Sequence, residues 1–333
     1  MRKPAFVLWF VCCALVGSIV RSGSAQQVAS RIAYASNPDG NWEIYLTAPD
    51  GGRPIRLTRR ESQDRFPLWS PDGSRIAFGS QVRGDHWELW VMDADGTDQR
   101  QLATDIVAKG HRQWSPDGRS IVFAASVNGD VEVLTVEVGS GRVTRLTNSA
   151  GEDGDPAWSP DGRRIAFSSM RDGNHEIYLM RADGSEQRRI TVDATADRSP
   201  HWSPDGSRIA FVSKRGGAGD VWVARVDDGT QERLTTGVHA TNDGARWSPD
   251  GAWIAVQTSE AVYKIKLIRM SDRKVRTVPG TATYDGQLSW SPHSNRLVFI
   301  SGRNGVDAVY LTDLEGEPRR VTGTQSLNPA LSP

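Results

Sequence analysis

The sequence contains very little cysteine. Only two of its 333 residues are cysteines, Cys12 and Cys13, and both lie within the first 25 residues. A mature protein without that segment has no thiol, which excludes disulfide bonds and thiolate metal sites. Its stability must then come from a packed core.

An excess of charge of one sign is also missing. Forty Lys and Arg residues balance forty Asp and Glu residues, and no long basic run occurs. Recognition of nucleic acid or of an acidic membrane surface uses clustered basic residues. We therefore expect neither nucleic acid nor membrane lipid as a partner.

A long apolar run occurs only at the start of the chain. Ala5 to Val20 is almost wholly apolar and follows the basic residues Arg2 and Lys3. This run is shorter than the roughly 20 residues that span a bilayer, and its flanks are typical of a secretory signal. We expect a signal peptide at residues 1–25, cleaved after Ala25, and a periplasmic or secreted protein with no stable membrane span.

Helical periodicity is absent from the rest of the chain, and a repeat takes its place. The pentapeptide Trp-Ser-Pro-Asp-Gly recurs at intervals of 41 to 45 residues, if a degenerate sixth copy and a final stub at Leu331 are included. The six tryptophans that begin these copies are Trp69, Trp114, Trp158, Trp202, Trp247 and Trp290. An apolar triplet recurs in step from Ile32 to Leu297, which gives seven units.

Each unit predicts four β-strands separated by turns rich in Gly, Asn and Asp. A four-stranded unit of this size cannot bury both of its faces alone, so the units must pack around a common axis. We predict an all-β fold, a seven-bladed β-propeller over residues 26–333, with six blades as the alternative. The last residues, Asn328 to Pro333, resemble the strand that opens a unit, so we expect the C-terminal strand to pair with the N-terminal blade and close the ring.

The repeated segments resemble those of a known family. The units WSPDGSRIAFGS (Trp69 to Ser80) and WSPDGRRIAFSSMRDGNHEIYLMRADG (Trp158 to Gly184) are similar to the propeller repeats of the TolB family. The resemblance implies a periplasmic propeller whose channel mouth binds protein partners, including lipoproteins linked to the cell wall. The resemblance concerns the propeller alone. It implies an α/β domain ahead of the propeller in TolB proteins, whereas only Gln26 to Ser30 lie between the expected signal peptide and the first predicted strand here. Similar propellers accompany peptidase domains, but the Gly-x-Ser-x-Gly elbow of such enzymes is absent from the sequence.

The repeated tryptophans are interpreted as structural. A residue that recurs once per blade at one position is expected to pack between neighbouring sheets. The alternative is a stacking platform for sugars or bases, since aromatic faces serve that purpose.

Acidic residues recur five positions before the tryptophan, where the chain enters the innermost strand. They are Asp64, Asp153, Asp197 and Asp285, with Asp243 close to the equivalent place in another unit. A ring of carboxylates would focus negative potential and could hold Ca²⁺ or another divalent cation, or the basic end of a peptide. The alternative is that each aspartate caps its own turn. The series is interrupted by Lys109 and Ser326.

Three histidines lie in the same segments, at His111, His201 and His239. Imidazole is a common ligand for transition metals, and some seven-bladed propellers similar to this family are metal-dependent lyases of pectin fragments. The alternative enzyme is therefore an oligogalacturonate-type lyase whose metal ligands are Asp153, Asp197, His111, His201 and His239.

The predicted function is a monomeric, non-catalytic binding module with no required cofactor, which recognises a protein or peptide at the channel mouth. An envelope lipoprotein is one candidate partner. The five aspartates Asp64, Asp153, Asp197, Asp243 and Asp285 are the predicted binding residues, and no residue is predicted to be catalytic. The alternatives are the metal-dependent lyase and a structural scaffold of the cell envelope.

Overall fold

The computed structural model describes residues 30–84, 86–106, 111–280, 284–291, 296–303, 305–323 and 325–332. The expected signal peptide with Cys12 and Cys13 lies outside these residues, as do Lys109 and Pro333. In the described part of the chain every regular element is a β-strand. No helix there is long and apolar enough to cross a membrane.

The strands form antiparallel sheets of one repeated kind. The first sheet joins both ends of the described chain and contains β28 (Ser326–Leu331), β1 (Ile32–Ser36), β2 (Glu43–Ala48) and β3 (Gly51–Arg56). Three others are β12 (Asp153–Trp158), β13 (Arg164–Ser169), β14 (Glu176–Arg181) and β15 (Arg188–Arg189); β16 (Asp197–Trp202), β17 (Arg208–Gly216), β18 (Ala218–Arg225) and β19 (Gln231–Arg233); and β20 (Ala240–Trp247), β21 (Trp253–Ser259), β22 (Tyr263–Arg269) and β23 (Val275–Thr277). A fifth contains β24 (Asp285–Trp290), β25 (Leu297–Ser301), β26 (Ala308–Thr312) and β27 (Arg319–Arg320).

One sheet has eight strands because two four-stranded units touch. The first unit is β4 (Gln63–Trp69), β5 (Arg75–Arg83), β6 (His86–Asp93) and β7 (Arg100–Ile106), and the second is β8 (Arg112–Trp114), β9 (Ser120–Val127), β10 (Asp130–Glu137) and β11 (Val143–Arg145). The pairing of Ile106 with Ala125 joins β7 to β9. Apart from that contact, both units have the same four-stranded order as the other sheets.

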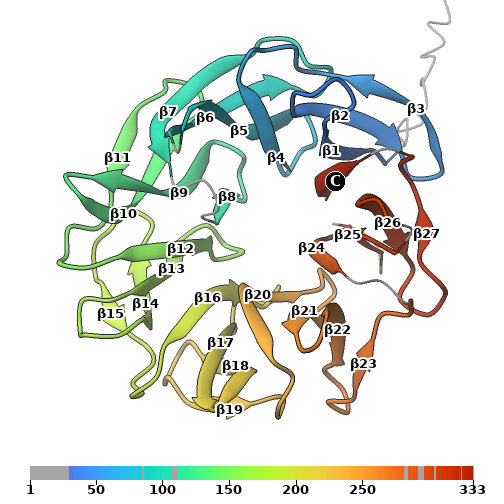
Figure 1. Cartoon of the computed structure of the whole chain (residues 1–333). Coiled ribbons are helices and arrows are strands. Elements are labelled where there is room, and N and C mark those ends of the chain that lie inside the picture. The colour runs from blue at the N-terminus through green and yellow to red at the C-terminus, as the bar shows by residue number, and fades with distance from the viewer. Residues whose placement is uncertain are drawn as a thin grey trace, which may run out of the picture.

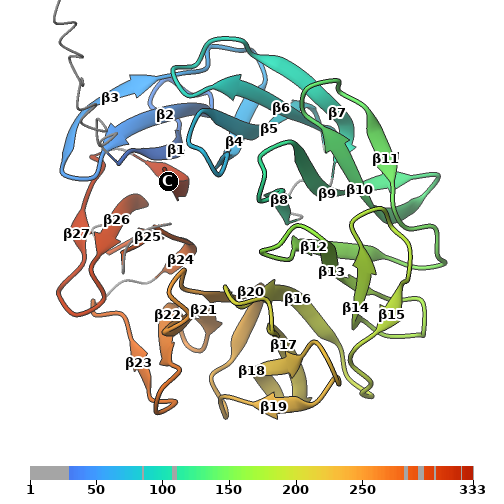
Figure 2. The same cartoon turned by 180° about the vertical axis from the view of Figure 1, so that it is seen from behind.

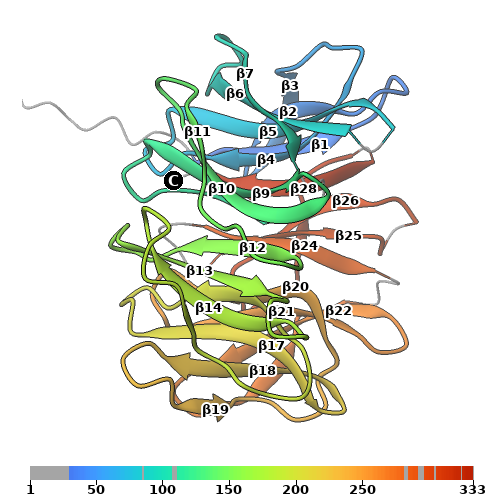
Figure 3. The same ribbon diagram turned by 90° about the vertical axis from the view of Figure 1, so that its left-hand side faces the viewer.

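The sheets are arranged around a common centre, so the fold is propeller-like. The first strands of the units, β4, β8, β12, β16, β20 and β24, lie nearest the centre together with β28, and the last strands lie at the periphery (Figures 1 and 2). We call these seven the inner strands. Seen from the side, the sheets lie one above another (Figure 3). The final strand β28 pairs antiparallel with β1, with Leu331 opposite Ile32.

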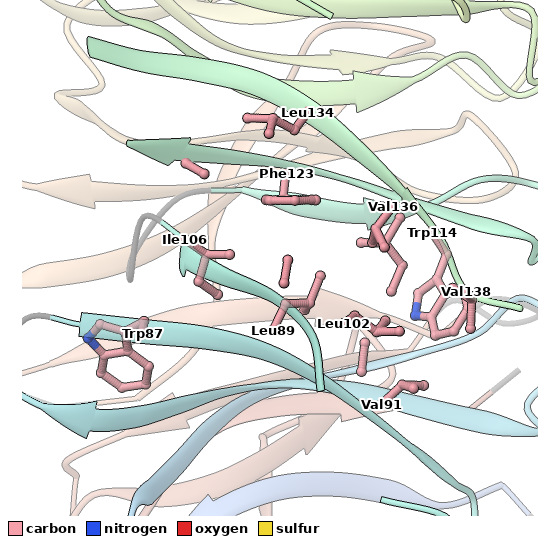
Figure 4. Packing of buried hydrophobic residues seen from close by; sticks show 14 residues of the cluster. Trp87, Leu89, Val91, Leu102, Ile106, Trp114, Phe123, Leu134, Val136 and Val138 are labelled. Atoms are coloured by element: carbon pink, nitrogen blue, oxygen red, sulfur yellow. The ribbon is translucent and has the colours of Figure 1, made fainter. Parts of the chain in front are cut away.

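The core lies between neighbouring sheets. One cluster is built from Trp87 on β6, Trp114 on β8, Phe123 on β9 and Val136 on β10, all almost fully buried (Figure 4). Burial of apolar area on this scale is the main term that stabilises a protein without disulfides. Because each cluster draws on two units, no unit buries its apolar faces alone.

The six repeated tryptophans connect neighbouring sheets, and all are at most 9% exposed. Four of them donate the indole N–H to a backbone oxygen on the neighbouring inner strand. The acceptor residue stands one position before that strand's own repeated residue, which is a tryptophan or Leu331. These bonds are Trp69 to Ala330 (3.3 Å), Trp114 to Leu68 (3.1 Å), Trp202 to Ala157 (3.0 Å) and Trp290 to Arg246 (3.0 Å). The tryptophans thus pack and bond between sheets.

Trp158 and Trp247 are connected in a different way. Their indole nitrogens are buried without a hydrogen-bond partner among the described residues. Instead, the backbone N–H of Trp158 donates to Gln113 Oε1 (2.7 Å), and that of Trp247 donates to His201 Nδ1 (3.4 Å). In these two units the backbone N–H of the tryptophan, and not its indole N–H, makes the hydrogen bond to the preceding unit.

The repeated Arg-Leu-Thr segment is explained by a buried polar network. Arg189 donates to Glu176 at 2.7 Å, and Thr191 Oγ donates to the same carboxylate at 2.5 Å and accepts the backbone N–H of Ile177 at 2.9 Å. Equivalent networks join Glu43, Arg56 and Thr58; Glu132, Arg145 and Thr147; and Asp220, Arg233 and Thr235. Charge-assisted bonds of this kind satisfy carboxylates that are removed from water.

Candidate functional site in the central channel

The predicted acidic ring is not formed, because its members are buried within separate sheets. Asp64, Asp153, Asp197 and Asp285 have no exposed surface. Each lies opposite a serine of the adjacent strand, which directs it into the packing of its own unit. Asp243 differs, because it is exposed on β20. The inner strands therefore do not bring these five carboxylates together.

Three of the buried aspartates are neutralised by an arginine of their own sheet. Arg171 Nη2 lies 3.0 Å from Asp153 Oδ2, and Arg171 Nε donates to Ser169 Oγ at 2.8 Å. The guanidinium also lies 4.7 Å above the ring of Tyr178, a favourable cation–π arrangement. The same set recurs as Asp197, Ser213 and Arg215, and as Asp285, Ser301 and Arg303.

Asp64 lacks this arginine. The residue 18 positions after it is Val82, where Arg171 follows Asp153 by 18. Ser80 Oγ donates to Asp64 Oδ1 at 2.6 Å, while Oδ2 has no hydrogen-bond partner in the described structure. Burial therefore raises the pKa of Asp64 to about 6. Burial also raises the pKa of Asp197 to about 6, although Arg215 opposes the shift.

The predicted metal ligands are likewise separated. Asp153 and Asp197 are held by arginines of their own units. His239 is exposed just before β20, His111 stands just before β8, and His201 lies on β16. Among the described residues no three or more His, Cys, Asp or Glu side chains lie close enough together to hold a metal ion. The set of ligands expected for a lyase is not assembled.

The residues three positions before the repeated tryptophan occupy equivalent places on or beside the inner strands, and several of them contact one another. They are Phe66, His111, Asp155, Ser199, Gly244 and Gln287, with Asn328 in the equivalent place on β28. All except His111 have φ between 49° and 89°, and strand pairing is interrupted there by β-bulges. A bulge redirects a side chain out of the ordinary alternation.

Contacts between these residues show how narrow the centre is. Asp155 lies between His111 (Nδ1 to Oδ1, 3.7 Å) and Ser199 (Oγ to Oδ2, 3.4 Å). A Cβ on Gly244 would lie 3.1 Å from Ser199 Cβ and 3.6 Å from His111 Cε1. Residues on β12, β16 and β20 and the residue just before β8 thus converge, and glycine is required where they approach most closely.

A cavity of about 460 Å³ lies at the end of the channel formed by the Trp-Ser-Pro-Asp-Gly turns. The residues immediately before the repeated tryptophans contribute Gln113, Ala157, His201, Arg246 and Ser289 to its lining. The rim adds prolines and tryptophans of the repeated motif: Pro116, Pro160, Pro204, Pro249, Trp158, Trp202, Trp247 and Trp290. We call this cavity the channel mouth.

The channel mouth carries positive charge. Arg246 makes no ion pair with any described residue; burial lowers its pKa, and the charge of Asp243 opposes that shift. A guanidinium keeps its positive charge in proteins. Burial, with a further contribution from the charge of Arg246, lowers the pKa of His201 to about 3, so the imidazole is neutral at pH 7. This charge lies at the ends of the inner strands, whereas Asp153, Asp197 and Asp285 of the predicted acidic ring stand at the beginnings of theirs.

Arg246, Gln113 and Ser289 were not among the residues predicted from the sequence. The signal that identifies them is variation within the repeat. The position before the tryptophan holds Leu, Gln, Ala, His, Arg and Ser in successive units, whereas the motif after it is nearly constant. A position that the shared fold leaves free is available for a purpose particular to this protein.

The family of the chain follows from a comparison of its repeats with known domains. A model of the TolB β-propeller domain matches residues 80–333, most of the chain. The chain belongs to this family. The TolB repeat thus accounts for the tryptophan-containing inner strands and for the turns that surround the channel mouth.

Relatives of this TolB-family propeller include a Tol-Pal system protein TolB from Desulfosudis oleivorans, 46% identical over 55 residues. That segment is 16% of this chain and 13% of the relative, so only a small part of the relative's length is matched. Among solved structures, TolB from Acinetobacter baumannii has a TM-score of 0.62 and 21% identity, covering 91% of this chain and 67% of that one. An oligogalacturonate lyase from Vibrio parahaemolyticus has a TM-score of 0.68 and 18% identity, covering 84% and 85%. At these identities the two structures share the fold with this chain, and one fold serves many activities.

Proposed function

We propose that this TolB-family chain is an exported, non-catalytic binding module that holds a protein or peptide partner at the channel mouth. The observation that carries this proposal is the cavity of about 460 Å³ into which inner strands of several units direct side chains. A concave site with a few placed polar groups in an apolar rim is typical of ligand recognition. A relative named as a Tol-Pal system protein supports a protein as the partner.

The proposal includes a ring of seven blades. The support for this number is the four-stranded unit that recurs along the chain, with the two halves of the eight-stranded sheet counted separately. The pairing of β28 with β1 supplies the fourth strand of the first blade. A ring closed in this way has no exposed sheet edge between its ends.

A binding role also fits the arrangement at the centre of the channel. A hydrolytic triad requires the histidine to contact the serine whose proton it removes. Here Asp155 lies between His111 and Ser199, so the carboxylate contacts both and separates the base from the hydroxyl. The described residues also provide no cluster of metal ligands for a lyase.

The proposal is tested by site-specific photo-crosslinking of the exported protein in cell envelopes. A photoreactive residue at Ser289 in the channel mouth is expected to capture one defined protein, identified by mass spectrometry. The matched control carries the same residue at Ile55 on β3, which is 62% exposed and far from the inner strands. Equal adducts at both positions would show that the mouth is not a specific surface. Turnover of oligogalacturonate by the purified protein would contradict the non-catalytic assignment.

A further inference from the structure

The position before the repeated tryptophan is polar in four inner strands, at Gln113, His201, Arg246 and Ser289. It is apolar in the remaining three, at Leu68, Ala157 and Ala330. All seven occupy the same place in the repeat, and the apolar examples show that the fold does not need a polar side chain there. Gln113 and His201 accept the backbone N–H groups of Trp158 and Trp247 in the next unit. Arg246 and Ser289, which also line the channel mouth, call for another explanation.

Arg246 is the one among them with a permanent charge. Arg171, Arg215 and Arg303 each meet an aspartate of their own sheet. Within the described residues Arg246 forms no ion pair of this kind, although the charge of Asp243 acts on it, and no Asp or Glu lines the cavity that it faces. Its backbone oxygen is fixed by the indole N–H of Trp290 at 3.0 Å. Holding a half-buried guanidinium without a directly paired carboxylate is costly, and a bound anion would reduce that cost.

The neighbouring side chains add donors rather than acceptors. Gln113 uses its Oε1 oxygen to accept the backbone N–H of Trp158, which leaves its amide N–H groups available. Ser289 brings a hydroxyl group to the same cavity. His201 is neutral and does not add a second positive charge. One guanidinium with neutral donors beside it matches a ligand group of single negative charge.

We propose that the channel mouth binds a carboxylate, supplied by an acidic side chain or the C-terminus of the partner peptide, with Arg246 as its counterion. The inference that a peptide supplies this carboxylate rests on the proposed function. The apolar rim of prolines and tryptophans fits the flanking parts of a peptide. The side chains of Arg246 and Gln113 then determine which peptides are accepted.

The test is calorimetric titration of the exported protein with acetylated triglutamate amide, and with triglutamine amide as the uncharged counterpart. We expect triglutamate to bind and triglutamine to bind far more weakly. Arg246→Gln is expected to weaken triglutamate binding by about ten- to a hundredfold, the loss of a charge-assisted hydrogen bond. The matched control Arg53→Gln removes the same charge from an exposed position on β3 and leaves the affinity unchanged.

A second variant guards against misfolding of the first. Gln113→Glu keeps an oxygen that accepts the backbone N–H of Trp158 and places a negative charge in the cavity. It is expected to weaken triglutamate binding to a similar extent with little change in Tm. Both variants are compared with the unmodified protein by circular dichroism.

Affinity unchanged in Arg246→Gln and Gln113→Glu would overturn the proposal, as would failure of triglutamate to saturate the protein at about 1 mM. Binding of trigalacturonate in place of triglutamate would also overturn it, since the carboxylate would then come from a sugar. The crosslinking at Ser289 separates the two proposals. Capture of a protein whose binding does not depend on Arg246 would refute the carboxylate site alone. Binding of triglutamate that depends on Arg246, with no protein captured at Ser289, would refute the protein-binding function alone.

Discussion

Arg171 and Asp153 form a buried ion pair, with Nη2 of the arginine 3.0 Å from Oδ2 of an aspartate that has no exposed surface. Asp153 begins β12, whereas Arg171 lies in the hairpin between β13 and β14, where Ser169 accepts a hydrogen bond from its guanidinium. An aspartate that looks available for a ligand in the sequence is thus committed to the blade.

Arg171→Leu is expected to lower the free energy of unfolding by about 3–5 kcal/mol, because it leaves Asp153 buried without a counterion. Urea denaturation measures the change. The control is Arg181→Leu, which removes an ion pair with Glu186 between two largely exposed side chains and is expected to cost less than about 1 kcal/mol. Equal losses in the two variants would refute a structural role for the buried pair.

Asp64 predicts a pH dependence of stability. Burial raises its pKa to about 6 from an ordinary value of 3.8, so the folded state binds the proton more tightly than the unfolded state. The contribution of Asp64 to stability is fully present below pH 4 and is lost as the pH rises through about 6. Asp64→Asn should therefore become more stable relative to the unmodified protein between pH 4 and 6, by up to roughly 3 kcal/mol.

Val82→Arg is the complementary test of Asp64, since it supplies the arginine that pairs with the equivalent aspartate in three other sheets. The added charge is expected to lower the pKa of Asp64 and to reduce the pH dependence between pH 4 and 6. Denaturant unfolding at several pH values measures both variants. If Asp64→Asn keeps the full pH dependence, Asp64 is not its source.

The two ways of connecting tryptophans predict unequal effects of the same substitution. Trp202→Phe removes the hydrogen bond from Nε1 to the backbone oxygen of Ala157, whereas Trp158→Phe removes a buried indole N–H that has no partner in the described structure. Both lose similar apolar area. Trp202→Phe should therefore destabilise by about 1 kcal/mol more, measured by thermal unfolding. A larger loss for Trp158→Phe would contradict this assignment.

His201 is expected to remain neutral in the folded protein well below pH 6, because burial and then the charge of Arg246 lower its pKa to about 3. The unfolded state takes up this proton near pH 6.5, so the contribution of His201 to stability is present above pH 6.5 and declines as the pH falls. NMR should show no titration of its imidazole between pH 7.5 and 5. In His201→Gln the amide oxygen can accept the backbone N–H of Trp247, as Gln113 accepts that of Trp158. The part of the pH dependence of stability that His201 contributes should then disappear.

The sequence predicted the all-β fold, the four-stranded units and the TolB family, because the Trp-Ser-Pro-Asp-Gly turn recurs in phase. It did not predict where the aspartates point. Asp153 and Arg171 are 18 residues apart, and only strand pairing shows that Ser169 lies between them. Arg246 was missed because its significance depends on a cavity lining without Asp or Glu, which only the folded chain reveals.

The pairing of β1 with β28 also has a consequence for the order of folding. Residues 32 to 36 find their partners among residues 326 to 331, nearly the full length of the chain away. Strand β1, which is synthesised early, can therefore pair with β28 only after the last segment of the chain has been made. Contacts between such distant residues form slowly, so the first sheet is the part most exposed to chaperones and proteases before the final residues arrive.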